Sequence, residues 1–325
     1  MTEIIDLNKG RNASISAIRM ISMVFIILCH FFQYYENELC KWFNVGVQIF
    51  FVISGWLYAN KQIDDPISFI LRNFKKILVP YWSFLFAAVI LYLLFARDYL
   101  SPIDVFKSVV CAGTIKGLGH LWFVGYILFC YLLTPYLYWL KLKMDNKSTA
   151  KSIVIYSIIL VAIQITGFAF NSYFLPYRVS CYVIGFFMGS LWPRFSKKNK
   201  RIFVLFVLIP TIIMSVGRIY FRYLTNGCFE GMALTAFVLY SHMMLGITIF
   251  LVLIQLLHSI KYNAFLHWSD SISYHIYIVH VLFILSPFSL MELTAFSVIN
   301  YLFIIIATIV TSICLKIVCQ RILHN

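Results

Sequence analysis

Two polar side chains interrupt the apolar stretch at residues 14–34, and their types and spacing could serve chemistry inside a membrane. Arg19 and His30 lie 11 residues apart in a run that is long enough to cross a bilayer as a helix. At about 100° per residue this separation returns to nearly the same helical face, about 16 Å further along the axis. Ionisable groups are costly in lipid, so residues of this kind face protein or water and mark a functional site.

Each of these two residues suits a definite chemical role. The planar guanidinium of Arg19 can bind phosphate or carbonyl oxygens through parallel hydrogen bonds. The imidazole of His30 can take a proton from a weak nucleophile as a general base, or it can carry an acyl group itself, and the sequence leaves these roles open. The pattern therefore predicts one helix with an anion-binding end and a proton-accepting end.

Three further cations lie in the stretch DDPISFILRNFKKILVPYW, which follows the second apolar run. Arg72, Lys75 and Lys76 stand at positions i, i+3 and i+4, on or near one face of a helix. Such a cluster beside a membrane cavity suits the phosphates of a ligand. It also fits topogenic charge and contact with lipid headgroups, and the sequence leaves both interpretations open.

Other polar side chains in apolar runs are candidates for a substrate pocket. Trp122, in GHLWFVGYIL, could equally be an interfacial anchor, which is the usual role of Trp there. The run SDSISYHIYIVHVLFIL carries His275, Tyr277 and His280, of which His275 fits a hydrogen-bonded structural role at least as well as a functional one. The candidate pocket residues are Ser54, His120, Trp122, Tyr277 and His280.

The composition is that of a helical membrane protein. The chain has 325 residues, of which 62% are hydrophobic and 12% charged, and a soluble domain would need far more polar surface. We therefore expect an all-α, polytopic membrane bundle that forms a single domain over 1–325, without a cleavable signal peptide. The net charge of +14 is assigned to cytoplasmic loops in contact with the bilayer and not to nucleic-acid binding. Five cysteines fall in apolar runs without metal-ligand spacing and are expected to be small core residues: Cys29, Cys130, Cys181, Cys314 and Cys319.

Hydropathy predicts about ten transmembrane helices. We place them at 14–34, 43–60, 79–96, 121–140, 152–170, 179–193, 202–217, 234–257, 272–290 and 297–318. A short amphipathic surface helix is expected within 97–120. With this arrangement, 18 of the 26 Lys and Arg residues fall on one side of the membrane and seven on the other. The excess of cations marks the cytoplasmic side, so both termini are predicted to be cytoplasmic.

Together these features resemble the acyltransferase family 3 membrane proteins, which acylate surface glycans and related molecules. The matching features occur in the family's order and cover residues 14–318: Arg19 with His30, then VGVQIFFVISGWLY, FKKILVPYW, GHLWFVGYIL and SISYHIYIVH. The family's essential Arg and His fall on Arg19 and His30. Its basic position before the Pro-Tyr-Trp-like turn falls on Arg72 or Lys75.

The resemblance implies a multi-pass enzyme of the cell (inner or plasma) membrane that transfers an acyl group, most simply acetyl. The donor would be cytoplasmic acetyl-CoA or another acyl-CoA, and the acceptor a hydroxyl of a cell-envelope polysaccharide or a lipid-linked sugar. Catalysis would rest on His30 and Arg19, without a metal. The donor would be bound by Arg19, Arg72, Lys75 and Lys76. The oligomeric state is left open.

The sequence departs from the family at two points, and a second class of function remains. Gln48 stands where many members have an acidic residue, so a carboxylate partner for the histidine is not expected there. Many members also carry an extracellular domain that completes transfer, and this sequence does not contain one. A polysaccharide or lipid-linked sugar exporter of the same fold would not need a basic pocket beside Arg19. Three other cations hint at an acidic glycan but are expected to be solvated or bound to headgroups: Arg178, Arg218 and Arg222.

Overall fold

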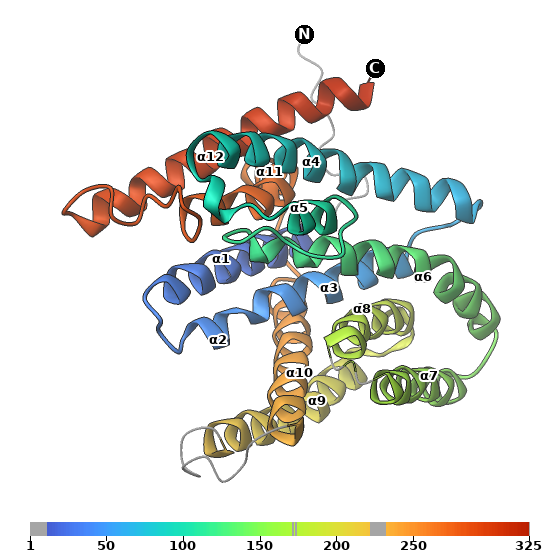
Figure 1. The fold of residues 1–325 in the computed structure, drawn as a ribbon. Helices are drawn as coiled ribbons and strands as arrows, with labels where there is room; N and C mark the ends of the chain where they lie inside the picture. Colours follow the sequence, from blue (N-terminus) through green and yellow to red (C-terminus); the bar gives the residue numbers. More distant parts are fainter. Residues whose placement is uncertain (1–11, 171, 173, 222–231, 325) are drawn as a thin grey trace.

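The computed structural model describes residues 12–324 apart from 171, 173 and 222–231 (Figure 1). Within these residues the chain is all-α and contains no strand. The α-helices are α1 (Ala13–Tyr34), α2 (Cys40–Phe43), α3 (Val45–Ala59), α4 (Pro66–Phe95), α5 (Pro102–Val109), α6 (Trp122–Asp145), α7 (Thr149–Ala169), α8 (Phe174–Leu191), α9 (Lys197–Ile219), α10 (Met232–Leu256), α11 (Ala264–Val279) and α12 (Ser297–His324). Short 3₁₀ turns join some of them: η1 (Arg97–Tyr99), η2 (Gly119–Leu121), η3 (Trp192–Arg194) and η5 (His280–Phe283).

Eight segments of the described chain are long and apolar enough to span a membrane. They are Ala13–Tyr34, Cys40–Ala59, Pro66–Phe95, Gly119–Asp145, Thr149–Ala169, Lys197–Ile219, Phe237–Leu256 and Ser297–Leu323. These account for eight of the ten expected spans. The other two correspond to α8, with 18 residues, and α11, with 16 residues.

Helix α3 lies at the centre of the bundle and packs against α1, α8 and α10 (Figure 1). Glycines permit its closest contacts. A Cβ atom on Gly55 would lie 2.0 Å from the Tyr182 carbonyl oxygen of α8, and one on Gly185 would lie 2.2 Å from the Val52 carbonyl oxygen of α3. Small residues let membrane helices approach in this way, so van der Waals contact replaces the hydrophobic effect as the driving force for packing.

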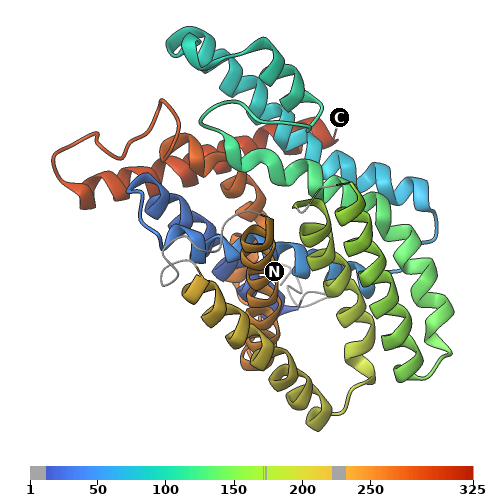
Figure 2. The same ribbon diagram turned by 60° about the horizontal axis from the view of Figure 1, so that its bottom comes forward.

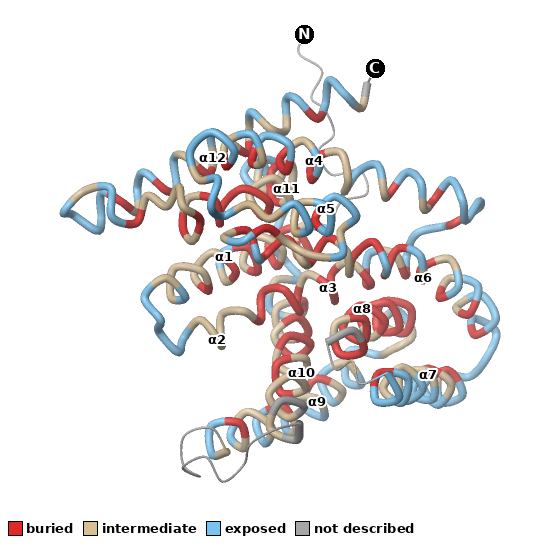
Figure 3. The backbone as a smooth tube through the Cα atoms, in the orientation of Figure 1, coloured by how far each residue is buried: buried red, intermediate tan, exposed pale blue. Residues whose placement is uncertain are grey.

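The remaining helices surround this centre. Helix α7 packs on α8, which in turn packs on α6, and Figure 2 shows these green segments side by side. Helices α9 and α10 pack on each other, and α12 packs on α4 and α11. Burial follows the same order: α3 and α8 are largely buried, whereas α7 and α12 expose much of their surface (Figure 3). Apolar side chains on these outer faces suit contact with lipid tails.

Helix α4 begins earlier than the sequence analysis predicts. Asp65 caps it by accepting hydrogen bonds from the backbone N–H groups of Ile67 and Ser68, and Pro66 occupies the first turn. The basic stretch before residue 79 is therefore part of one 30-residue helix, and the predicted boundary was wrong. Pro80 was expected near the start of a span at 79–96, but it lies inside α4 and is buried.

The span expected at 272–290 is also misplaced. Helix α11 begins at Ala264, capped by the side chain of Asn263, and ends at Val279, followed by η5 and irregular backbone. Its polar first half lies within the helix because its side chains are partnered inside the bundle. The chain then turns at Ser286, whose hydroxyl accepts from the N–H of Phe288 across Pro287. A residue before proline avoids the helical region, so Pro287 prevents helical structure from continuing through Ser286.

The predicted surface helix and the predicted core cysteines can also be compared with the structure. The short surface helix expected within 97–120 is confirmed as α5. Of the five cysteines expected in the core, four are buried, but Cys314 is exposed. It faces outward because α12 presents much of its surface to lipid, where a small apolar side chain carries no penalty.

Candidate active site

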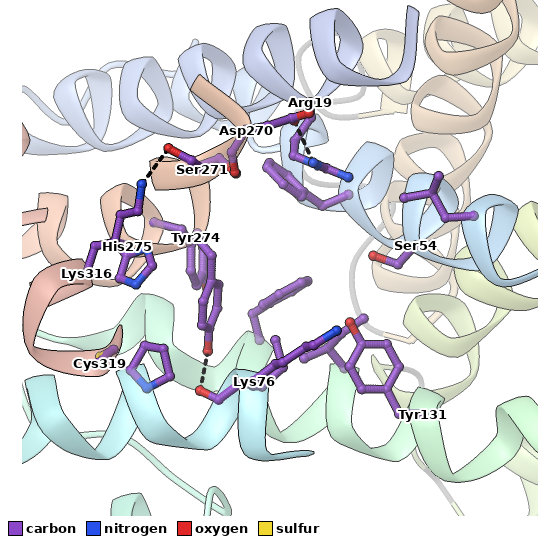
Figure 4. Close-up of a pocket in the computed structure, with 18 of the residues that line it drawn as sticks. Arg19, Ser54, Lys76, Tyr131, Asp270, Ser271, Tyr274, His275, Lys316 and Cys319 are labelled. Atoms are coloured by element: carbon purple, nitrogen blue, oxygen red, sulfur yellow. Dashed lines mark hydrogen bonds and ion pairs between the residues drawn. The ribbon is translucent and has the colours of Figure 1, made fainter. Parts of the chain in front are cut away.

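The first half of α1, the part of α11 from Asp270 to Tyr277 and the end of α12 meet at a cavity of about 600 Å³, which we call the Arg19 cavity (Figure 4). Helices α3, α4 and α6 complete its wall. The volume is typical of small-molecule sites. Its charged lining residues are Arg19, Lys76, Asp270 and Lys316.

Arg19 is held in this cavity by a carboxylate that the sequence analysis missed. Its Nη1 lies 2.6 Å from Asp270 Oδ1, and the hydroxyl of Ser16 donates to Asp270 Oδ2. These contacts join the first turns of α1 to the first turns of α11. Within the described part of the chain the guanidinium makes no other hydrogen bond, so its Nε and Nη2 groups are available to a ligand.

Two lysines complete the charge of the Arg19 cavity. Lys316 Nζ donates to Ser271 Oγ at 2.9 Å, which places the end of α12 beside α11. Lys76 lies on the opposite wall, which α4 contributes (Figure 4). Three cations and one carboxylate make the lining net positive, which favours an anionic ligand.

More cations lie near the Arg19 cavity. The Lys61 ammonium lies 5.7 Å from the ring centroid of Tyr58, a lining residue. Partial burial, together with the nearby charges of Lys76 and Arg72, lowers the pKa of Lys61. Lys75 is exposed on α4, and neither it nor Arg72 lines the cavity. Of the predicted donor-binding residues, Arg19 and Lys76 thus meet in one cavity, and the roles of Arg72 and Lys75 stay predictions.

A second cavity, of about 570 Å³, lies toward the other end of α1, and we call it the His30 cavity. His30, His120 and Trp122 line it, together with residues that follow η5. The only charged side chain among its described lining residues is that of Glu36, which is exposed. Three of the predicted site residues therefore share this cavity although they are far apart in the sequence.

His30 belongs to a cluster of three imidazoles. Its ring centroid lies 5.2 Å from that of His280 and 6.1 Å from that of His120, and the His120 and His280 centroids are 5.2 Å apart. Gln33 Oε1 lies 3.0 Å from His30 Nδ1, so that nitrogen carries the hydrogen and Nε2 is left as the proton acceptor. A neutral imidazole in this tautomer is suited to act as a general base.

A layer that contains Tyr277 and Phe123 connects the linings of the two cavities. Tyr277 lines the Arg19 cavity, and its hydroxyl donates to the backbone carbonyl of His120 in the His30 cavity. Phe123 also lines the Arg19 cavity, and its ring centroid lies 5.2 Å from that of Tyr277. A reacting group held near this layer would be close to both cavities.

The structure separates the five predicted pocket residues into groups. His120 and Trp122 line the His30 cavity, and His280 joins the histidine cluster behind it. Ser54 and Tyr277 line the Arg19 cavity. His275 also lines the Arg19 cavity, as do residues that were not singled out: Asp270, Tyr274 and Lys316. An acidic residue in the run SDSISYHIYIVH was the available signal for Asp270.

The outer arginines are not solvated as expected. Arg218 is buried, with Nη2 donating to the Lys41 carbonyl and the guanidinium 4.3 Å from the ring centroid of Trp42. Arg178 stacks on Trp122, with 3.5 Å between its guanidinium carbon and the ring centroid. Both are held by aromatic faces, which attract cations inside the protein. Arg222 lies outside the described residues.

A family model described as an acyltransferase domain matches residues 12–317. The chain belongs to the acyltransferase 3 family. No match was found among curated proteins or solved structures. The protein is thus a multi-pass membrane acyltransferase, and the helix that carries Arg19 and His30 lines both cavities.

Proposed function

We propose that this acyltransferase moves an acyl group, most simply acetyl, from acyl-CoA to a hydroxyl of a cell-surface or lipid-linked glycan. The observation that supports this most is the contrast between the two cavities. The Arg19 cavity is lined by three cations and one carboxylate, and the His30 cavity by imidazoles and hydrogen-bonding groups, with Glu36 as the only charged side chain among its described lining residues. A polyanionic donor suits the first, and a hydroxyl-bearing acceptor suits the second.

The donor would be held through its anionic groups. Arg19 offers Nε and Nη2 to a phosphate or to a carbonyl oxygen of the donor arm, while Asp270 fixes the guanidinium. Lys76 and Lys316 add positive charge on the other walls. The thioester would then lie at the layer formed by Phe123 and Tyr277, close to the histidines.

The chemical step is a direct transfer in this scheme. His30 Nε2 takes the proton of the acceptor hydroxyl, and the oxygen forms a bond to the thioester carbonyl carbon. The carbon–sulfur bond breaks, and the thiolate leaves with the electron pair. The proton is finally returned to the sulfur, so the products are the glycan ester and free CoA. General-base help of this kind contributes roughly 10²–10⁴-fold to the rate.

An exporter of polysaccharide is the competing function, and it would not need the cations of the Arg19 cavity. The test uses the purified full-length protein in nanodiscs, with radiolabelled acetyl-CoA and surface glycan from the source cells whose O-acyl groups have been removed by mild alkali. We expect label to enter the glycan as an alkali-labile ester. If no label is transferred while glycan crosses membranes that contain the protein, the exporter function should replace ours.

A further inference from the structure

Two buried imidazole nitrogens beside His30 have no hydrogen-bond partner in the described structure. They are His120 Nδ1 and His280 Nε2, and the catalytic scheme above does not use them. A buried acceptor without a partner costs about 1–3 kcal/mol. Two such atoms in one cluster therefore indicate a role beyond packing.

The other nitrogen of each ring fixes its tautomer. His120 Nε2 lies 2.9 Å from the carbonyl oxygen of Ile278, and His280 Nδ1 lies 3.0 Å from that of Ile276. A carbonyl oxygen only accepts, so each of these nitrogens carries the hydrogen. With His30 held in the same way by Gln33, the cluster presents three lone pairs and no donor of its own.

The cluster has the geometry to share a proton. Each of the two free nitrogens belongs to a ring whose centroid is between 5.2 and 6.1 Å from that of His30. At 5.2 Å between centroids, a nitrogen of His280 can come within reach of a hydrogen bond to His30 once one ring is protonated, whereas at 6.1 Å His120 acts on His30 through the field of its lone pair. In the neutral cluster the nitrogen lone pairs of the three rings repel one another. When His30 is protonated, the lone pairs of His120 and His280 instead attract its positive charge.

Among the described residues, no carboxylate forms a hydrogen bond or ion pair with His30 that could stabilise its protonated form. Gln48 donates to the hydroxyl of Tyr177, and Asp270 is engaged with Arg19 in the other cavity. Glu36 lines the rim of the His30 cavity but makes no hydrogen bond or ion pair to His30 in the described structure. In a hydrolytic triad a carboxylate stabilises the imidazolium that forms when the base takes a proton.

We propose that His280 and His120 are positioning residues that stabilise His30 after it has taken the acceptor's proton. In this step the O–H bond of the acceptor breaks and an N–H bond forms on His30. The lone pairs of His280 Nε2 and His120 Nδ1 then stabilise the imidazolium until the proton passes to the departing thiolate. The inference rests on the proposed function, and it assigns to two imidazoles the role that a carboxylate has elsewhere.

His280 gives the sharper test because it does not line the His30 cavity, so its replacement should leave acceptor binding intact. His280→Phe keeps a planar ring and removes the lone pair, and His280→Gln restores an acceptor oxygen. The matched control is His242→Phe, since His242 is also buried with an unpaired Nε2 but lies on α10 and lines neither cavity. Each protein is assayed in nanodiscs for kcat and KM, with radiolabelled acetyl-CoA and alkali-treated glycan, and for its melting temperature.

We expect kcat of His280→Phe to fall by roughly 10- to 100-fold, less than the loss on removing the base itself, with KM for the glycan unchanged. His280→Gln should recover part of kcat, and His242→Phe should match the wild type. The melting temperature of His280→Phe should stay close to that of the wild type, because the unpaired buried Nε2 and the hydrogen bond from Nδ1 to the Ile276 carbonyl are removed together and their effects on stability oppose each other.

Two results would overturn the inference. One is a His280→Phe variant with wild-type kcat, and the other is a loss of kcat that only accompanies a lower melting temperature and that Gln does not rescue. If His30→Ala is inactive while His280→Phe is fully active, only the positioning role fails. If His30→Ala is itself fully active, the proposed function fails.

Discussion

Arg19 and His30 share one face of α1 but have different partners. Arg19 forms an ion pair with a carboxylate on α11, whereas His30 is oriented by the neutral amide of Gln33 on its own helix. An ion pair positions a permanent charge for binding, and a neutral partner leaves an imidazole free to take a proton. The two residues should therefore fail in different ways when they are replaced.

Arg19→Lys keeps the charge but loses the planar fork, so it should weaken acetyl-CoA binding and be partly rescued by high donor concentration. His30→Ala leaves the Arg19 cavity whole, so it should bind acetyl-CoA normally but transfer on the order of 10²–10⁴-fold more slowly. Donor affinity and glycan acylation would be measured on each variant in nanodiscs. The assignment is reversed if His30→Ala abolishes donor binding and Arg19→Lys leaves it unchanged.

Asp270 should act on the donor only through Arg19. Asp270→Asn removes the charge partner of the guanidinium, and Arg19→Lys removes its fork. Because the two side chains touch, their effects on acetyl-CoA affinity should not add, and we expect a coupling energy of about 1–2 kcal/mol in a double-mutant cycle. Isothermal titration of the wild type, both single variants and the double variant measures it. Additive losses would mean that Asp270 does not position Arg19.

The sequence identifies Arg19 and His30 as polar residues that are costly to place in a membrane, but it does not show which residues contact them. Arg19 and His30 stand out because an apolar run makes them anomalous. Asp270 lies 251 residues from Arg19, and only the packing of α11 against α1 selects it as the partner. The histidine cluster has the same origin. His120 and His280 were predicted as pocket residues, but their contact with His30 depends on where α11 ends.

At the scale of the helices, glycines on α3 and α8 determine how closely the central pair packs. A methyl group at Gly55 would meet the backbone of Tyr182 and Phe186, which cannot move aside as the end of a flexible side chain can. Gly55→Ala should therefore destabilise the protein by about 1–3 kcal/mol through overpacking. The readout is thermal unfolding in detergent.

Gly119→Ala is the matched control for this prediction, because a Cβ atom there meets nothing within 4 Å. Its melting temperature should stay close to the wild-type value. Equal melting temperatures for Gly55→Ala and Gly119→Ala would show that α3 and α8 can separate at no cost, and that the close contact does not determine the bundle's stability.

Helix boundaries were the weaker part of the sequence prediction, for a definite physical reason. Hydropathy finds apolar windows, but capping side chains decide where helices begin. Asp65 starts α4 ahead of its apolar part, and Asn263 starts α11 ahead of its apolar part. The polar turns that follow those caps, with Lys76 on α4 and Asp270 on α11, line the Arg19 cavity. Two charged residues that hydropathy left in loops thus contribute to the site.

At the scale of the molecule, the two cavities lie toward opposite ends of α1, and the layer of Phe123 and Tyr277 forms a wall that connects them. An acyl group can cross from one to the other if the wall is the place of reaction, without movement of a whole substrate through the bundle. The scheme requires the Arg19 cavity to open toward cytoplasmic acyl-CoA, and the distribution of Lys and Arg predicts this orientation.

Labelling of engineered cysteines with a membrane-impermeant reagent in intact cells tests the orientation. The sites chosen are exposed and lie outside the cavities: Lys107→Cys on α5, Lys147→Cys before α7 and Lys198→Cys on α9. Because 18 of the 26 cations fall on the predicted cytoplasmic side, the last two positions should react only after the membrane is permeabilised. Lys107→Cys should react in intact cells, and the unaltered chain reports the background labelling of native cysteines.

Labelling of the 147 and 198 sites in intact cells, without labelling at 107, would show that the protein has the opposite orientation in the membrane. His30 would then face the cytoplasm and the cations of the Arg19 cavity would face outward, so cytoplasmic acyl-CoA could not be the donor bound there.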